Sequence, residues 1–166
     1  MKTSLVNYAL TFFLLGNINL WADVKDNWPR FRGPNGIGTA DFAIPAKWSK
    51  DTIRWDTELP GEGHGSPAVW GDKVFLNAAR SKGKERLVVC LDARSGKVLW
   101  TKTFAFKTHK ANKRNSFASS TPAVDADAVY VAWGNQTELK VTALSHDGKQ
   151  LWQGNFGKVI GNHGFG

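Results

Sequence analysis

Cysteine and methionine are nearly absent from this sequence, because one of each occurs among its 166 residues. A single thiol, Cys90, cannot form an internal disulfide, and its apolar surroundings favour a buried, unreactive side chain. The four histidines show none of the Cys-x-x-Cys or His-x-x-x-His spacings typical of zinc sites. These absences exclude a disulfide-stapled domain and argue against a zinc centre.

Motifs that bind phosphate or activate a nucleophile are also missing. The glycine-rich run 61–65 precedes an expected strand, whereas a phosphate loop opens a helix. Gly65-Ser66-Pro67 begins the same strand and is not a nucleophile elbow. Asp125 and Asp127 alternate within a turn, and no acid/base pair is evident. The sequence therefore predicts no catalytic, cofactor-binding or metal-ligating residue.

A long apolar run occurs only at the N-terminus. Lys2 gives a positive start, residues 5–15 form a mostly apolar core, and Ala22 is a small residue suited to cleavage before Asp23. The core falls short of the ~20 residues that a membrane-spanning helix requires. We therefore expect residues 1–22 to be a cleaved signal peptide, with no membrane span after its removal and a periplasmic or secreted location.

Basic residues outnumber acidic ones by 22 to 14, for a net charge of +8. An excess of this size can indicate a nucleic-acid or membrane-surface partner. Here the cations are dispersed among expected strand ends and loops, apart from a denser run at 107–114. We interpret that run as a solvated loop and expect no nucleic-acid partner.

The sequence does contain a repeated hairpin. The apolar run 87–91 predicts a strand, and residues 92–96 predict a turn in which Asp92 accepts backbone N–H groups and Gly96 adopts a positive φ. A second strand carrying Trp100 follows. Residues 143–152 repeat the pattern with a shorter turn, so that Trp152 lies 52 residues after Trp100.

Each hairpin follows a similar pair of expected strands, and a partial copy, Ile53-Arg54-Trp55, precedes the first. Four short strands repeated every ~40–50 residues are typical of β-propeller blades. We therefore expect an all-β fold: an incomplete arc of about two four-stranded antiparallel blades. The expected units are blades at about 66–104 and 121–156 within a partial propeller at 48–166, an orphan outer strand at 48–59, and an extended leader at 23–47 pinned by Trp28 and Phe31.

The repeat resembles that of pyrroloquinoline quinone (PQQ) type propellers, in which an Ala, an Asp, a Thr-Gly pair and a Trp hold neighbouring blades together. The resemblance covers roughly residues 48–166 by the repeat criterion, and residues 28–36 resemble the opening of bacterial secreted members. Cys90 and Ser95 stand where the family has Ala and Thr, and Ser145 replaces the Asp in the second copy. The resemblance implies a blade-stapling role for Asp92, Gly96, Trp100, Gly148 and Trp152. We expect Trp100 and Trp152 to occupy equivalent places, each packed against the adjoining turn.

Two glycine-rich segments before expected inner strands carry histidine, at the place where a propeller's central channel opens. With nearby hydroxyl residues they could form a polar ring at the channel mouth. The alternative is that these groups satisfy backbone atoms between adjacent blades. The residues of this candidate ring are His64, Ser66, Ser119, Ser120, Thr121 and His163.

Two blades and a partial copy cannot close a propeller, which needs at least ~4 blades. We therefore expect the chain to be the N-terminal part of a longer protein whose remaining blades complete the fold. The resemblance implies three possible functions: a non-catalytic interaction or ligand-binding scaffold, a PQQ-dependent dehydrogenase, and an outer-membrane assembly scaffold.

Quinoprotein members bind PQQ with calcium and carry adjacent cysteines and acidic groups around the metal, which this sequence lacks. No cysteine directly follows the expected cleavage site, which weakens a lipid-anchored assembly role. We therefore favour a scaffold whose partner, a protein or a small ligand, is unknown. No cofactor is expected in this segment, and PQQ and calcium belong only to the dehydrogenase alternative.

Overall fold

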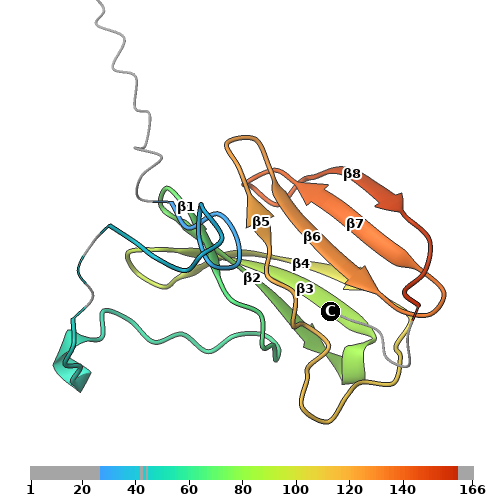
Figure 1. Cartoon of the computed structure of the whole chain (residues 1–166), viewed down its shortest axis with the longest axis horizontal. Helices are drawn as coiled ribbons and strands as arrows, with labels where there is room; N and C mark the ends of the chain where they lie inside the picture. The colour runs from blue at the N-terminus through green and yellow to red at the C-terminus, as the bar shows by residue number, and fades with distance from the viewer. Residues whose placement is uncertain (1–26, 42, 44, 161–166) are drawn as a thin grey trace, which may run out of the picture.

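The computed structural model describes residues 27–41, 43 and 45–160, where two antiparallel sheets of four strands each form the fold (Figure 1). Within each sheet the strands follow one another in sequence order. This confirms the expected all-β class with four-stranded antiparallel units. The first sheet contains β1 (Ala68–Trp70), β2 (Lys73–Arg80), β3 (Glu85–Asp92) and β4 (Val98–Ala105), and the second contains β5 (Ala123–Val124), β6 (Val129–Gly134), β7 (Leu139–Leu144) and β8 (Gln150–Asn155).

The signal peptide expected at residues 1–22 lies outside the described residues, as does His163. Helical structure in the described ranges is limited to two 3-10 turns, η2 (Lys50–Thr52) and η3 (Ser81–Gly83). No helix there is long and apolar enough to cross a membrane.

The main core lies between the two sheets. Successive side chains of β3 point to opposite faces, and Val88 and Cys90 face the second sheet, where they join a cluster that includes Trp133 and Leu144. The intervening Leu87, Val89 and Leu91 form a second cluster on the other face, which Leu59 partly covers. Burial on both faces explains why β3 is a continuous apolar run rather than an alternating one.

The two sheets share one register. Cys90 pairs with Phe75 on one side and Trp100 on the other. Ala143 pairs in the same way with Tyr130 and Trp152. The alanine of the family pattern and its replacement Cys90 therefore occupy equivalent places. Complete burial raises the pKa of the Cys90 thiol to about 12, so the thiol stays protonated and unreactive at neutral pH.

The leader runs along the inner edges of both sheets. The backbone of Trp28 exchanges two hydrogen bonds with Val69 of β1, at 3.0 and 2.8 Å, and the carbonyl oxygen of Pro29 accepts a hydrogen bond from the backbone N–H of Val124 in β5. Trp28 is half-buried, whereas Phe31 is 59% exposed. The expectation that both aromatic residues pin the leader is therefore correct for Trp28 and wrong for Phe31, because backbone pairing at Trp28 already fixes this segment.

The expected outer strand at 48–59 is not a strand in the described structure. It contains the 3-10 turn η2, and from Ile53 to Leu59 it is extended chain without a ladder partner in the described part. An extended segment becomes a strand only when a neighbouring strand completes its hydrogen bonds. The side chain of Trp55 nevertheless holds this segment against the first sheet.

Candidate functional site

A tryptophan of one sheet rests on a turn of the next. The indole Nε1 of Trp100, in β4, donates a 2.9 Å hydrogen bond to the carbonyl oxygen of His146 in the β7–β8 turn. Gly148 of that turn has φ +81°, and a Cβ there would lie 2.9 Å from the Trp100 ring. Only glycine combines this backbone angle with so close a ring.

The same contact occurs one unit earlier. The Trp55 indole donates to the carbonyl oxygen of Ala93 at 3.0 Å, and a Cβ on Gly96 would lie 2.5 Å from the Trp55 ring. Trp55 precedes Trp100 by 45 residues, which is close to the repeat length. The partial copy in the sequence carried this tryptophan, although the sequence analysis gave it no stapling role.

The hairpin turns themselves differ. In the first, Asp92 Oδ1 accepts hydrogen bonds from the backbone N–H groups of Arg94 and Ser95 and from the Ser95 hydroxyl. The Ser95 hydroxyl, followed by the backbone donors, lowers the pKa of the Asp92 carboxyl. In the second turn, the Ser145 hydroxyl accepts a 3.1 Å hydrogen bond from the Lys149 backbone N–H. The Asp92 carboxylate therefore stabilises the turn of its own hairpin.

Trp152 lies in the register position of Trp100 but in a different environment. It is 45% exposed, and its ring neighbours Tyr130 at a centroid distance of 6.2 Å. No turn in the described ranges packs against it in the way that Gly148 packs against Trp100. The structure thus shows the equivalent placement of the two tryptophans but a turn contact at only the first.

Several members of the candidate polar ring lie at the junction of the two sheets. The Thr121 hydroxyl accepts from the Ser66 backbone N–H at 3.1 Å. The Ser120 hydroxyl accepts from Asn77 Nδ2 at 3.0 Å and donates to the carbonyl oxygen of Ala132 at 3.1 Å. Ser119 is half-buried beside them. These contacts join backbone segments of neighbouring sheets, as the alternative to an open ring would have them.

His64 lines a different feature, an open cleft of about 850 Å³. Three segments form the cleft: residues 59–64 before β1, residues 79–83 at the end of β2 and in the β2–β3 turn, and residues 115–117 before β5. The backbone N–H of His64 donates to Ala118 O at 3.0 Å, while its imidazole is exposed. In the β2–β3 turn, Ser81 and Lys82 have φ of 55° and 53°, a conformation that costs ~1–2 kcal/mol for each non-glycine residue.

Two ionisable groups beside this cleft, Arg80 and Glu85, are engaged with each other. Arg80 Nε lies 2.9 Å from Glu85 Oε2, and the Ser81 hydroxyl donates to the same oxygen at 2.7 Å. The hydrogen bond from Ser81 and then that from Arg80 hold the pKa of Glu85 below its usual value. A carboxylate stabilised in this way is a weak base, so it is poorly suited to activating Ser81 as a nucleophile.

A buried arginine lies next to the cleft and was not predicted from the sequence. Arg86, in β3, is 0% exposed, and its guanidinium lies between the rings of Phe106 and Phe117 at 4.9 and 5.2 Å. None of its three side-chain nitrogens has a hydrogen-bond partner. Burial lowers the pKa of Arg86 to about 10, which leaves the group charged at pH 7. Phe117 also lines the cleft.

The repeat contained a signal for this residue. Arg86 pairs with Ala79 in the first sheet, and the equivalent pair in the second sheet is Leu139 with Gly134. An arginine therefore stands where the neighbouring unit has a leucine. Aligning the two copies beyond the Trp and Gly positions could have identified it.

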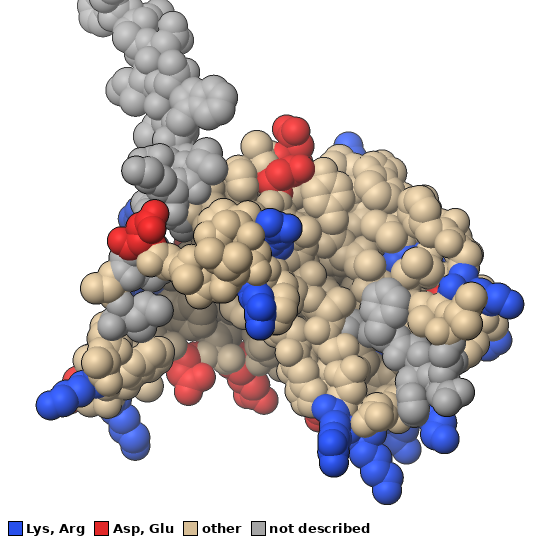
Figure 2. Space-filling view, viewed as in Figure 1, with Lys and Arg blue, Asp and Glu red and all other residues tan. Residues whose placement is uncertain are grey.

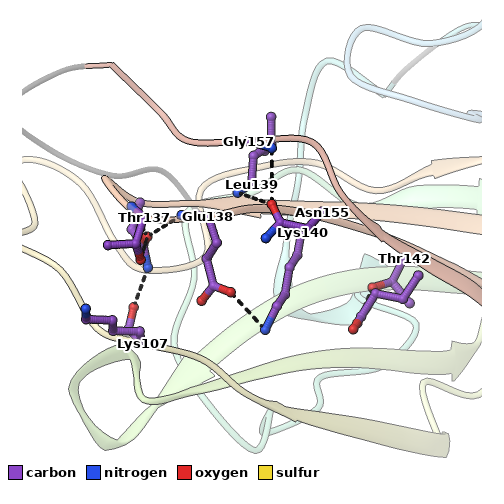
Figure 3. A network of polar contacts seen from close by, with 10 residues as sticks. Lys107, Thr137, Glu138, Leu139, Lys140, Thr142, Asn155 and Gly157 are labelled. Atoms are coloured by element: carbon purple, nitrogen blue, oxygen red, sulfur yellow. Dashed lines mark hydrogen bonds and ion pairs between the residues drawn. The ribbon is translucent and has the colours of Figure 1, made fainter.

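Three hydrogen bonds, two within the basic run 107–114 and one from the residue before it, hold the start of the run. Lys84 O accepts from the Phe106 backbone N–H at 2.9 Å, Lys82 O accepts from the Thr108 hydroxyl at 2.7 Å, and Lys107 O accepts from Asn135 Nδ2 at 2.8 Å. Figure 3 shows Lys107 next to the β6–β7 turn, where Glu138 and Lys140 point toward each other at 3.0 Å. Blue side chains gather at the lower end of the molecule in Figure 2, where Figure 1 places the β4–β5 link.

Within the described residues, no three His, Cys, Asp or Glu side chains are grouped closely enough to hold a metal ion. Glu62 is the carboxylate that lines the cleft, and Arg80 and Lys82 add positive charge there. Calcium takes about 6–8 oxygen ligands. The donor set described here therefore does not fit a calcium ion.

Comparison with known proteins gives three findings. The family model described as outer membrane protein assembly factor BamB matches residues 50–158. A polyvinylalcohol dehydrogenase of Sphingopyxis sp. (strain 113P3) is 27% identical over 135 residues, covering 81% of this chain and 18% of that protein. The structure of BamB from Moraxella catarrhalis matches with a TM-score of 0.46 and 24% identity, covering 66% of this chain and 30% of that one. The chain spans less than a third of either relative.

Proposed function

The chain belongs to the PQQ-like repeat β-propeller family, whose matching model is that of the outer membrane protein assembly factor BamB, and from this premise we propose that it is an exported, non-catalytic propeller that presents a binding surface. The engagement of Ser81 and Glu85 carries this proposal. The Ser81 hydroxyl and Arg80 both donate to Glu85, so this carboxylate is a weak base and the cleft offers shape and charge rather than an activated nucleophile.

The position of the cleft also suits binding. It opens between loops that precede β1 and β5 and the β2–β3 turn, and loops on a rigid sheet scaffold are common places for ligand contacts. Cys90, the one cysteine, is fully buried in the core, so its thiol is not accessible to a ligand in the cleft. The partner is a protein or a small ligand, and the signal peptide proposed at residues 1–22 places the protein in the periplasm or outside the cell.

Incubation of the intact protein with PQQ and calcium tests the non-catalytic role. We expect no retained quinone absorbance after desalting and no dye reduction with alcohol or sugar substrates, with a known quinoprotein dehydrogenase as the positive control. Stoichiometric PQQ uptake with substrate-dependent dye reduction would replace the scaffold by the dehydrogenase alternative, which the similarity to a polyvinylalcohol dehydrogenase favours.

N-terminal sequencing of the exported protein tests its location. We expect the mature chain to begin at Asp23 or within a few residues of it. A mature chain that still begins at Met1 would contradict export by this route.

A role in outer-membrane protein assembly is the second candidate, and the description of the matching family model favours it. Deleting the gene should then lower the amounts of outer-membrane proteins, and a plasmid copy should restore them. Unchanged amounts would exclude this candidate and leave the general binding role.

A further inference from the structure

The guanidinium of Arg86 carries a charge that no group in the described structure neutralises. It is 0% exposed, and its Nε and both Nη atoms lack a hydrogen-bond partner. The nearest carboxylate along the strand, Glu85, is engaged by Arg80 and Ser81. A second one, Glu138, is paired with Lys140 at 3.0 Å. Glu62, which lines the cleft, is exposed to water.

Such a group is unfavourable unless something compensates for its lost hydration. Burying an ion without a counter-charge is costly, and each unsatisfied buried donor adds to that cost. The rings of Phe106 and Phe117 offset part of the cost through cation–π contacts with the guanidinium. They leave the in-plane N–H groups without acceptors, and these groups form a planar fork that matches a carboxylate.

Phe117 separates this fork from the cleft. Its ring contacts the guanidinium on one side and lines the cleft on the other. A Cβ placed on Gly83 would meet the Phe117 ring and would lie 2.8 Å from Arg86 Nη1, so the cleft wall is thin here. Phe117 is half-buried, and its ring also packs edge-on against His109 at a centroid distance of 5.3 Å.

We propose that Arg86 anchors a carboxylate-binding site that is reached from the cleft past the ring of Phe117. A ligand carboxylate accepts the N–H groups of the guanidinium in a bidentate pair, and the rest of the ligand lies along the cleft wall formed by residues 61–64. Arg80 and Lys82 line the cleft, and the basic run 107–114 is bonded to Lys82 O through Thr108, so positive charge that attracts anions lies at and near the cleft.

This inference rests on the proposed role of the cleft as a binding surface, and it adds the chemical class of the ligand. The carboxylate can belong to a small organic acid or to an acidic segment of a polypeptide. Both sources present the same group to Arg86, so the experiment includes a probe for each.

Calorimetric titration of the intact protein with succinate tests the site, with Arg86→Leu as the matched variant. Leucine is the residue that the second sheet carries at the equivalent place, and replacing a buried charge by an apolar residue is often tolerated. We expect succinate to bind the unmodified protein and, near saturation, to raise its melting temperature by ~3 °C. Affinity should fall at least ~10-fold in Arg86→Leu.

Lys97→Ala serves as the charge control, because Lys97 is an exposed cation in the β3–β4 turn and does not line the cleft. Its affinity for succinate should equal that of the unmodified protein at matched ionic strength. The second probe is a tetraglutamate peptide compared with tetraglutamine. Tighter binding of tetraglutamate than of succinate identifies an acidic segment as the ligand source, whereas equal or weaker binding identifies a small acid.

Equal succinate affinity in the unmodified protein and in Arg86→Leu would overturn the proposal, and so would the absence of succinate binding to the folded unmodified protein. If Arg86→Leu does not fold, the arginine Nε–Hε resonance of the unmodified protein supplies a direct readout. It should shift on addition of succinate, and an unchanged resonance would equally overturn the site. Neither readout depends on PQQ or on dye reduction, so failure here is distinguishable from failure of the proposed function.

Discussion

At the scale of single residues, Trp100 joins the two sheets by two kinds of contact at once. Its indole N–H bonds the carbonyl oxygen of His146, and its ring lies on Gly148. Truncation removes both contacts and opens a void between β4 and the β7–β8 turn. We expect Trp100→Ala to lower the free energy of unfolding by about 3–5 kcal/mol, measured by urea denaturation followed by circular dichroism.

Two further variants separate the hydrogen bond of Trp100 from the packing of its ring. Trp100→Phe keeps a ring but loses the donor, so it should cost about 1 kcal/mol for the hydrogen bond alone. Trp152→Ala should cost about 1 kcal/mol, because Trp152 is 45% exposed and contacts no turn in the described ranges. A loss below ~1 kcal/mol at Trp100 would remove its stapling role.

Cys90 makes stability sensitive to alkaline pH. Its folded-state pKa of about 12 lies above the ordinary value of a thiol, so the folded state holds the proton more tightly than the unfolded chain. The stabilisation is complete below about pH 8.5 and declines as the pH rises toward 12. Between pH 7 and pH 10 the unmodified protein should lose about 2 kcal/mol more unfolding free energy than Cys90→Ala, measured by urea denaturation of both proteins at each pH.

Alanine suits this comparison because the second sheet has Ala143 at the equivalent place. Arg86 is present in both proteins, so any effect of its own titration cancels. An identical pH dependence for the two proteins would show that Cys90 is not the titrating group.

At the scale of elements, Asn135 organises the β6–β7 turn and the link between the sheets together. Its Oδ1 accepts from the Thr137 hydroxyl and from the backbone N–H groups of Thr137 and Glu138, while its Nδ2 holds Lys107 O. Asn135→Asp keeps the acceptors and removes the donor to Lys107. We expect faster tryptic cleavage at residues 107–114 than in the unmodified protein, measured by mass spectrometry under native conditions.

Thr108→Val provides the parallel case, since it removes a second side-chain hydrogen bond of the link, to Lys82 O. Both variants should be cut faster in this run while cleavage elsewhere stays unchanged. Cleavage at the unmodified rate in both would mean that these hydrogen bonds do not restrain the link.

The hairpins were the elements that the sequence predicted best. The Asp92–Gly96 turn is predictable because a local rule governs it: an acidic side chain accepts nearby N–H groups, and glycine takes the positive φ. The polar contacts of Ser120 and the environment of Arg86 depend on residues more than 30 positions away in the chain, or on the neighbouring sheet. No local pattern encodes such contacts, so the position of the cleft could not be predicted.

At the scale of the whole molecule, the second sheet has a partly uncovered outer side. Four large apolar side chains on β8 and just beyond it are between 45% and 93% exposed: Leu151, Trp152, Phe156 and Ile160. Exposed apolar groups on the last strand of a sheet favour association with another chain. We expect the 166-residue chain to elute as oligomers in size-exclusion chromatography and to bind the dye ANS.

The double variant Trp152→Lys/Phe156→Lys places two charges on this side of the sheet and should shift the protein toward monomer. Elution of the unmodified chain as a monomer with little ANS binding would show that these side chains do not drive association.

The tryptophan–glycine contacts also mean that, during synthesis, each indole is made before the turn that covers it. Trp55 precedes its glycine, Gly96, by 41 residues, and Trp100 precedes Gly148 by 48. A ribosome adding ~5–20 residues per second therefore delivers each indole ~2–10 s before the turn that covers it. Throughout translation the newest unit carries an uncovered indole, a surface that chaperones recognise. A pause in elongation just after Trp100 would lengthen this exposure, whereas a pause after Gly148 would come once the cover is available.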